Sequence, residues 1–163
     1  MTSDEALRQG RGDRAGFTFH RRPTSVPPDI RPEWRIPLLL MMVRRCRGQV
    51  ASREQLHVLN SAVLSAGSRK ALLAALDGRL ASRSPVLQFE PAFDRAIDRA
   101  LGLGLVATTP QGRLALTELG ESIADRVESE ERLFTSEREL LAELPRSLSQ
   151  TAIRSALAKR RMS

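Results

Sequence analysis

The fold of this chain is decided by residues 91–125, which read PAFDRAIDRALGLGLVATTPQGRLALTELGESIAD. The first third carries apolar side chains at three- and four-residue steps, which would line one face of a helix. These side chains are Phe93, Ala96, Ile97, Ala100 and Leu101. Pro91 suits a first helical turn, where its missing N–H is not needed, and Gly102 and Gly104 favour an end and a turn. The spacing predicts a helix from Pro91 to about Leu101.

The remainder of the stretch indicates a hairpin followed by a second helix. Residues 105–109 form a short, β-prone segment, and Pro110-Gln111-Gly112 is a turn signal. Residues 113–117 then alternate, with Leu114 and Leu116 on one face. Thr117 is a suitable N-cap, and Glu118 begins a first turn rich in negative charge. The expected core contacts join Ile97 and Leu101 to Leu114, Leu116 and Ile123.

Two short motifs in this stretch resemble those of MarR- and PadR-like winged-helix domains. They are Gly104-Leu105-Val106 after the first helix, and Leu116-Thr117-Glu118-Leu119-Gly120 after the hairpin. The resemblance implies a mainly α fold with a small two- or three-stranded β-wing, in which residues 91–101 form the third helix. An unrelated α+β domain with one hairpin is the alternative.

Composition limits the class of protein. The chain has 163 residues, of which 41% are hydrophobic, and a net charge of +7 carried almost entirely by arginine. The single cysteine, Cys46, cannot form an internal disulfide, which fits a reducing cytoplasm. No apolar run approaches the roughly 20 residues that a membrane span needs. We therefore expect a cytoplasmic protein, and the arginine bias suggests a bacterial one.

Three regions are expected along the chain. Residues 1–32 are rich in glycine, proline and arginine and predict a disordered basic tail. Residues 33–131 would form the winged-helix domain, and residues 132–163 a C-terminal helical extension.

The first half of the expected domain contains three helices. One should carry Pro37 in its first turn and run to about Arg47, and a second, over Ser52–Ser65, opens with a capping box. A third, capped by Ser68, would reach about Leu80. A helix-turn-helix joins its two helices by three or four residues, so residues 66–90 are too long for an ordinary turn. Either this third helix takes the role of the second helix of the motif, or the domain carries an insertion.

After the hairpin, the pattern predicts a long amphipathic helix from Glu118 to about Phe134. Its apolar stripe would comprise Leu119, Ile123, Val127 and Phe134. A capping box beginning at Ser136 predicts a short helix, and Gln150–Arg161 a last one. These terminal helices would need a partner surface, which their own domain, a second copy or another protein would supply.

The sequence carries no sign of catalysis or of a cofactor. His20 and His57 lie far apart, and with Cys46 they cannot complete a zinc site. There is no P-loop, dinucleotide fingerprint or nucleophile elbow. We expect no catalytic residues, no metal and no cofactor, which leaves a binding function.

The charge pattern names candidate binding residues. The exposed face of the 91–101 helix should carry Asp94, Arg95, Asp98 and Arg99, and would meet a partner or DNA. The wing offers Thr108, Thr109, Gln111 and Arg113. Basic candidates for phosphate contacts are Arg44, Arg45, Arg47, Lys159, Arg160 and Arg161. Because two carboxylates on the helix would oppose phosphates, the pattern favours a protein partner over sequence-specific DNA reading.

Two functional hypotheses follow. In the first, the chain is a non-enzymatic adaptor subunit of a bacterial assembly, with non-specific DNA contact. Residues 56–63, 68–73 and 89–93 resemble the middle-component subunits of ABC-three-component anti-phage systems, whose partners are SMC-like ATPases. In the second, the chain is a homodimeric MarR- or PadR-like transcription regulator, dimerised through its terminal helices. The fold alone supports both equally.

Overall fold

A computed structural model describes residues 32–78, 90–145 and 148–158. The expected tail lies outside these residues apart from Pro32, as do Lys159, Arg160 and Arg161. The described elements are α1 (Pro32–Arg45), η2 (Arg47–Gln49), β1 (Val50–Ala51), α2 (Arg53–Leu64), α3 (Ala66–Leu76), α4 (Pro91–Gly102), β2 (Val106–Thr108), β3 (Leu114–Leu116), α5 (Glu118–Ser129), α6 (Thr135–Glu143) and α7 (Gln150–Ala158). The described chain is mainly helical, as predicted.

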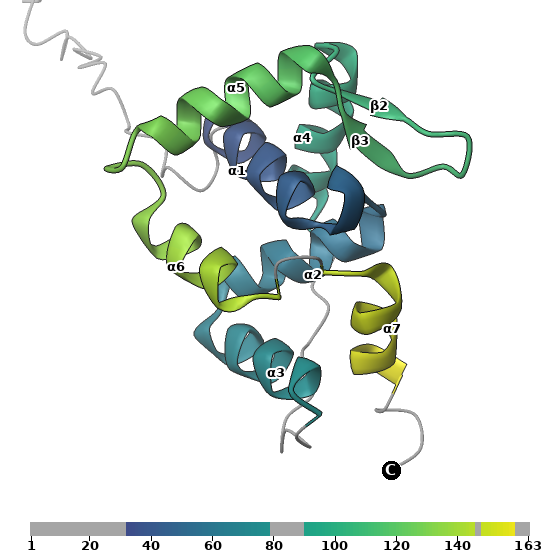
Figure 1. Cartoon of the computed structure of the whole chain (residues 1–163), viewed down its shortest axis with the longest axis vertical. Helices are drawn as coiled ribbons and strands as arrows, with labels where there is room; N and C mark the ends of the chain where they lie inside the picture. Colours follow the sequence, from purple (N-terminus) through teal and green to yellow (C-terminus); the bar gives the residue numbers. More distant parts are fainter. Residues whose placement is uncertain (1–31, 79–89, 146–147, 159–163) are drawn as a thin grey trace, which may run out of the picture.

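The strands form one small antiparallel sheet in the order β1-β3-β2. Strand β3 pairs with β2 through the hairpin, and on its other side Val50 and Ala51 of β1 pair with Ala115 and Leu114. The sequence predicted the hairpin, whereas β1 was missed because two residues carry no readable alternation. Along the chain, helix α1 is followed by strand β1, then by helices α2 to α4, and then by the β2–β3 hairpin. This order is compatible with a winged-helix-like fold (Figure 1).

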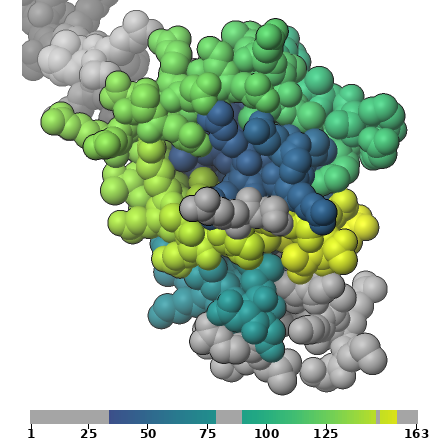
Figure 2. Space-filling model, in the orientation of Figure 1, coloured from purple at the N-terminus to yellow at the C-terminus, as the bar shows by residue number. Residues whose placement is uncertain are grey.

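Helix α1 lies at the centre of the hydrophobic core. Its residues 38–43 are all buried, and α4 and α5 pack against it. In the space-filling view α1 fills the middle of the face, between α5 above it and the C-terminal helices below it (Figure 2). The expected core contacts are confirmed in part. Ile97 and Leu114 are buried, while Leu101, Leu116 and Ile123 are half-buried against the same core.

The start of α1 corrects one prediction. The helix begins at Pro32, so Pro37 lies inside it and not in its first turn. An interior proline removes a helical hydrogen bond. Contacts made by the residues of α1 before Pro37 offset this cost. The Trp34 ring packs on Phe134 with ring centroids 5.5 Å apart, and Arg35 forms an ion pair with Glu90.

Two predicted helix caps are confirmed. Ser52 Oγ accepts from the Gln55 N–H at 3.1 Å while Gln55 Oε1 accepts from the Ser52 N–H at 2.8 Å, which completes the capping box of α2. Thr117 Oγ1 accepts from the Gly120 N–H at 3.1 Å at the start of α5. These caps depend on neighbouring residues only, which makes them predictable from sequence.

Two other caps differ from the prediction. Ser65, and not Ser68, caps α3, so that helix begins at Ala66, directly after α2, and ends at Leu76. The capping box expected at Ser136 does not form, because α6 begins at Thr135 and Ser136 therefore lies inside the helix. The N-cap position is held by Phe134, which has a left-handed φ of 55°.

Helix α5 is shorter than expected, and its predicted apolar stripe is confirmed in part. It ends at Ser129, and Leu119 is 53% exposed. Val127 of the predicted stripe is buried, and Ile123 and Phe134 are half-buried against the core, whereas Gly120 and Ala124 face the core in place of Leu119. Gly120 lies so close to the main chain before the hairpin that an ideal Cβ atom there would be 1.9 Å from the Leu105 carbonyl oxygen, which places this side of α5 inward.

The C-terminal helices share the core of the rest of the chain. The buried side chains of α6, α7 and the segment between them belong to the same cluster as those of α1 and α4, and are Leu140, Leu141, Leu144, Leu148 and Ile153. In Figure 1, α6 and α7 lie beside α2 and α3. Residues on both sides of the expected boundary at 131–132 are therefore packed together.

Candidate interaction face on α4 and the wing

The outward surface of α4 carries two parallel rows of side chains. Residues four apart lie one above the other on a helix, so Arg95, Arg99 and Leu103 form one row and Asp94 and Asp98 the other. Arg95 and Arg99 are exposed, and Leu103, which caps the helix, is 53% exposed. This surface and the adjoining hairpin tip make up the α4–wing face.

Arg53, at the start of α2, neutralises the row of aspartates. Its Nη1 contacts Asp94 Oδ1 at 2.6 Å and its Nη2 contacts Asp98 Oδ1 at 2.5 Å. The hydrogen bond that Arg53 donates to Asp98, together with the one it donates to Asp94, raises the pKa of Arg53. Arg53 was not predictable from the sequence, because 41 residues separate it from Asp94 and a guanidinium that bridges two residues of another helix leaves no local pattern.

The two aspartates differ in exposure. The Asp98 side chain is 61% exposed, as expected of a solvent-facing residue, whereas that of Asp94 is 30% exposed. Asp94 Oδ1 also lies 3.5 Å from Nε2 of His57, a buried residue whose ring packs edge-on against Phe93. Among the described residues, Arg95 and Arg99 form no ion pair, so α4 presents its cations outward and its carboxylates toward α2.

A second ion pair fixes the N-terminus of α4. Arg35 donates to both carboxylate oxygens of Glu90, at 2.7 and 2.5 Å, and Asn60 Nδ2 donates to Oε2 at 2.9 Å. Burial alone would raise the pKa of Glu90, but the hydrogen bonds from Arg35 and Asn60 outweigh it, and the net shift is downward. Residues from α1 and α2 therefore hold the residue that immediately precedes α4.

The wing contributes polar groups but turns its arginine inward. Arg113 Nη2 donates to the Val50 carbonyl at 2.8 Å and lies 3.5 Å from Gln55 Oε1, so it ties the hairpin to β1 and α2. Thr109 Oγ1 accepts from the Arg113 N–H at 3.1 Å, while Thr108 and Gln111 are exposed. The wing tip thus offers hydroxyl and amide groups without a free cation.

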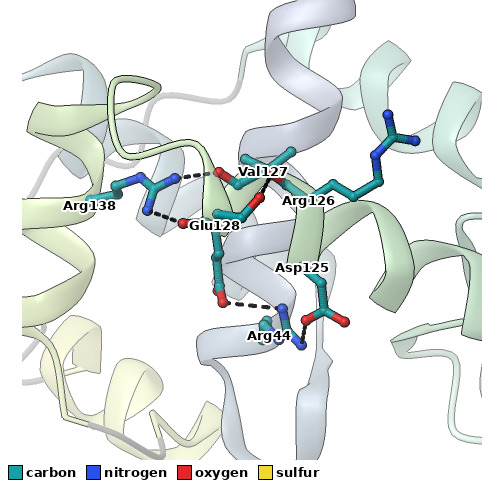
Figure 3. A network of polar contacts seen from close by, with 7 residues as sticks. Arg44, Asp125, Arg126, Val127, Glu128 and Arg138 are labelled. Atoms are coloured by element: carbon teal, nitrogen blue, oxygen red, sulfur yellow. Dashed lines mark hydrogen bonds and ion pairs between the residues drawn. The ribbon is translucent and has the colours of Figure 1, made fainter.

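The arginines at the end of α1 also hold the fold together. Arg44 pairs with Asp125 at 2.5 Å and with Glu128 at 3.2 Å (Figure 3). The hydrogen bond that it donates to Asp125 raises the pKa of Arg44. Arg45 donates to the Leu144 carbonyl at the end of α6. Arg47 is exposed and has no ion pair within the described part of the chain.

A further arginine closes the end of α5. The Arg138 guanidinium donates to the carbonyls of Val127 and Glu128 (Figure 3). It also donates to the carbonyl of Glu130, and its Nε donates to that of Leu133. Cations near a helix C-terminus satisfy the last carbonyls and favour the helix dipole. No sequence pattern indicates this role of Arg138, because its partners are main-chain atoms at the end of α5 and in the turn that follows it.

Charge is distributed unevenly over the chain. The described residues contain 14 basic and 15 acidic residues, a net charge of −1. Since the whole chain carries +7, the remaining residues account for +8. The described domain is therefore close to neutral.

The described residues carry no candidate metal site. None of their His, Cys, Asp and Glu side chains form a cluster of three or more able to hold a metal ion. Cys46 is buried, and burial raises the pKa of its thiol to about 11. No helix in the described ranges has the length and apolar character to cross a membrane.

The comparisons with known proteins add no family to these observations. The sequence matches no family model, and no significant match was found among curated proteins or among solved structures.

Proposed function

We propose that this chain is a non-enzymatic, winged-helix-like adaptor that binds another protein through the α4–wing face. One observation carries the proposal. Arg53 pairs with both aspartates of α4, which leaves an exposed row of Arg95, Arg99 and Leu103. A partner surface that combines carboxylates with an apolar side chain would complement this row.

Three features favour a protein partner over duplex DNA. DNA-binding domains usually show a strongly basic face, whereas the described residues carry a net charge of −1. The wing arginine is committed to the Val50 carbonyl. Leu103 adds an exposed apolar group beside the arginines, and arginine with apolar side chains is typical of protein interfaces.

The adaptor would belong to a bacterial cytoplasmic assembly. The resemblance of residues 56–63, 68–73 and 89–93 to middle-component subunits supports an SMC-like ATPase defence system as that assembly. Non-specific DNA contact is compatible with this role, because the residues outside the described ranges carry +8.

A homodimeric MarR- or PadR-like transcription regulator is the second candidate. It is favoured by one observation: Arg95 and Arg99 lie one turn apart, exposed, on the helix that immediately precedes the hairpin. In that place a winged-helix protein carries the helix that enters the major groove, where arginine binds guanine or phosphate.

Site-specific photo-crosslinking in the native host tests the proposal. A photoreactive phenylalanine derivative replaces Arg99 in the full chain, and the same group at exposed Glu139 on α6 is the matched control. We expect position 99 to form covalent adducts with one protein that position 139 does not capture. Adducts with DNA at position 99 would overturn the proposal in favour of the regulator.

A further inference from the structure

Helix α5 presents a groove on the side away from Arg44. The groove, of about 400 Å³, is lined by Ile123, Arg126, Val127, Ser129, Glu130 and Leu133. Leu133 is 46% exposed at one end, and Leu119, one turn before Ile123, is 53% exposed beyond the other end. Exposed leucines at both ends of one groove indicate a surface that another chain covers.

The charges of the groove are not used within the described part of the chain. Arg126 points away from the cluster of Arg44, Asp125 and Glu128, and neither Arg126 nor Glu130 forms an ion pair with a described residue (Figure 3). Asp125 and Glu128, the nearest other carboxylates of α5, are already paired with Arg44. The groove therefore offers one cation and one anion to an incoming surface.

The lining is complementary to itself. Ile123 and Arg126 belong to α5, whereas Glu130 caps that helix and Leu133 lies in the turn that follows, so a cation with an apolar neighbour is followed along the chain by an anion with an apolar neighbour. If two copies meet about a two-fold axis, each surface meets its own image in reverse order. Each Arg126 then faces the Glu130 of the other copy, and the apolar ends meet one another.

We propose that the α5 groove is the contact surface of a homodimer, with a second copy of this chain as its occupant. This inference rests on α5 and is independent of the partner proposed for α4. Stable interfaces bury about 1,200–2,000 Å² in total, and one groove with flanking leucines is a small patch, so the dimer is weak and depends on protein concentration.

Sedimentation velocity of the full chain over a range of concentrations tests the inference. We expect a reversible monomer–dimer equilibrium. Arg126→Glu places two carboxylates opposite each other at each contact, and Glu130→Arg places two guanidinium groups there. Either variant should therefore raise the dissociation constant of the dimer by about tenfold or more. Both positions are exposed, and circular dichroism checks that the variants remain folded.

Mixing the two variants gives the sharpest result. A heterodimer of Arg126→Glu with Glu130→Arg restores opposite charges at both contacts, so equal amounts should associate with an affinity near that of the wild-type chain. The double variant Arg126→Glu/Glu130→Arg should also dimerise. Leu64→Ala, at an exposed leucine on α2, is the control and should leave the equilibrium unchanged.

Three outcomes would overturn the inference. A wild-type chain that stays monomeric at the highest attainable concentration has no such dimer. A dimer that tolerates both single charge reversals uses another surface. Two single variants that fail to associate when mixed, although each is folded, exclude the two-fold pairing of Arg126 with Glu130.

Discussion

Gly120 of α5 lies directly against the main chain of Leu105, so close that a Cβ atom at this glycine would stand 1.9 Å from the carbonyl oxygen. The same junction is closed by Thr117, whose hydroxyl donates to the Gly104 carbonyl at 2.6 Å and whose N–H donates to that of Leu105 at 3.1 Å. These contacts join the two motifs on which the resemblance to winged-helix domains rests. The motif glycine is thus required by packing.

The first prediction concerns this junction. Gly120→Ala should lower the free energy of unfolding by about 2–3 kcal/mol, because α5 must move away from the hairpin to admit the methyl group. Gly102→Ala is the control, since an added Cβ there meets nothing within 4 Å and the residue lies in α4. It should be neutral or stabilise the chain by about 0.5 kcal/mol. Urea denaturation measures both, and equal effects would contradict the packing account.

The second prediction is a pH dependence that arises from Glu90. Because folding lowers the pKa of this carboxyl group, its contribution to stability is present above the pKa in the unfolded chain, about 4.3. That contribution is lost as the pH falls through the lower pKa of the folded state. Glu90→Gln should destabilise the chain at pH 7, and the difference from wild type should shrink as the pH falls below about 4.

Chemical denaturation over this pH range measures the effect. Glu139→Gln, at an exposed position on α6, should follow the wild-type curve throughout. If the loss in free energy of unfolding caused by Glu90→Gln stayed constant from pH 7 to about pH 2, the stabilisation by Glu90 would not depend on its charge, and the prediction would be contradicted.

The third prediction separates the two contacts of Arg53. Double-mutant cycles of Arg53→Ala with Asp98→Ala should give a coupling of about 0.2–1 kcal/mol, the range of exposed ion pairs. The cycle with Asp94→Ala should give a larger coupling, because that side chain is half-buried and lies beside His57. Equal couplings would mean that burial does not strengthen the contact. Replacing both aspartates by asparagine should leave the chain folded.

Local interactions made much of the fold predictable. The capping box at Ser52, the cap at Thr117 and the apolar spacing of α4 each involve residues within one or two helical turns, and all three are present. Ser65 shows the limit of this reasoning, because Ser65 and Ser68 are both acceptable caps and only the packing of α3 against α2 selects the first.

The candidate site was less predictable because long-range contacts decide it. Sequence reasoning identified Asp94, Arg95, Asp98 and Arg99 as one helix face. It did not show which charges remain free, since this depends on Arg53 of another helix. Arg113 likewise fits a wing cation in sequence, but its guanidinium is held by the Val50 carbonyl of a strand that the sequence did not reveal.

Whether the cations of α4 bind DNA is the most direct test of the central claim. Fluorescence anisotropy would compare duplex binding by the full chain with that of Arg95→Glu/Arg99→Glu. The matched control, Lys70→Glu/Arg132→Glu, makes the same change of net charge at exposed positions away from α4. The adaptor account predicts that both double variants alter duplex affinity to the same extent. A loss about tenfold greater for the α4 variant would contradict it and assign α4 to DNA.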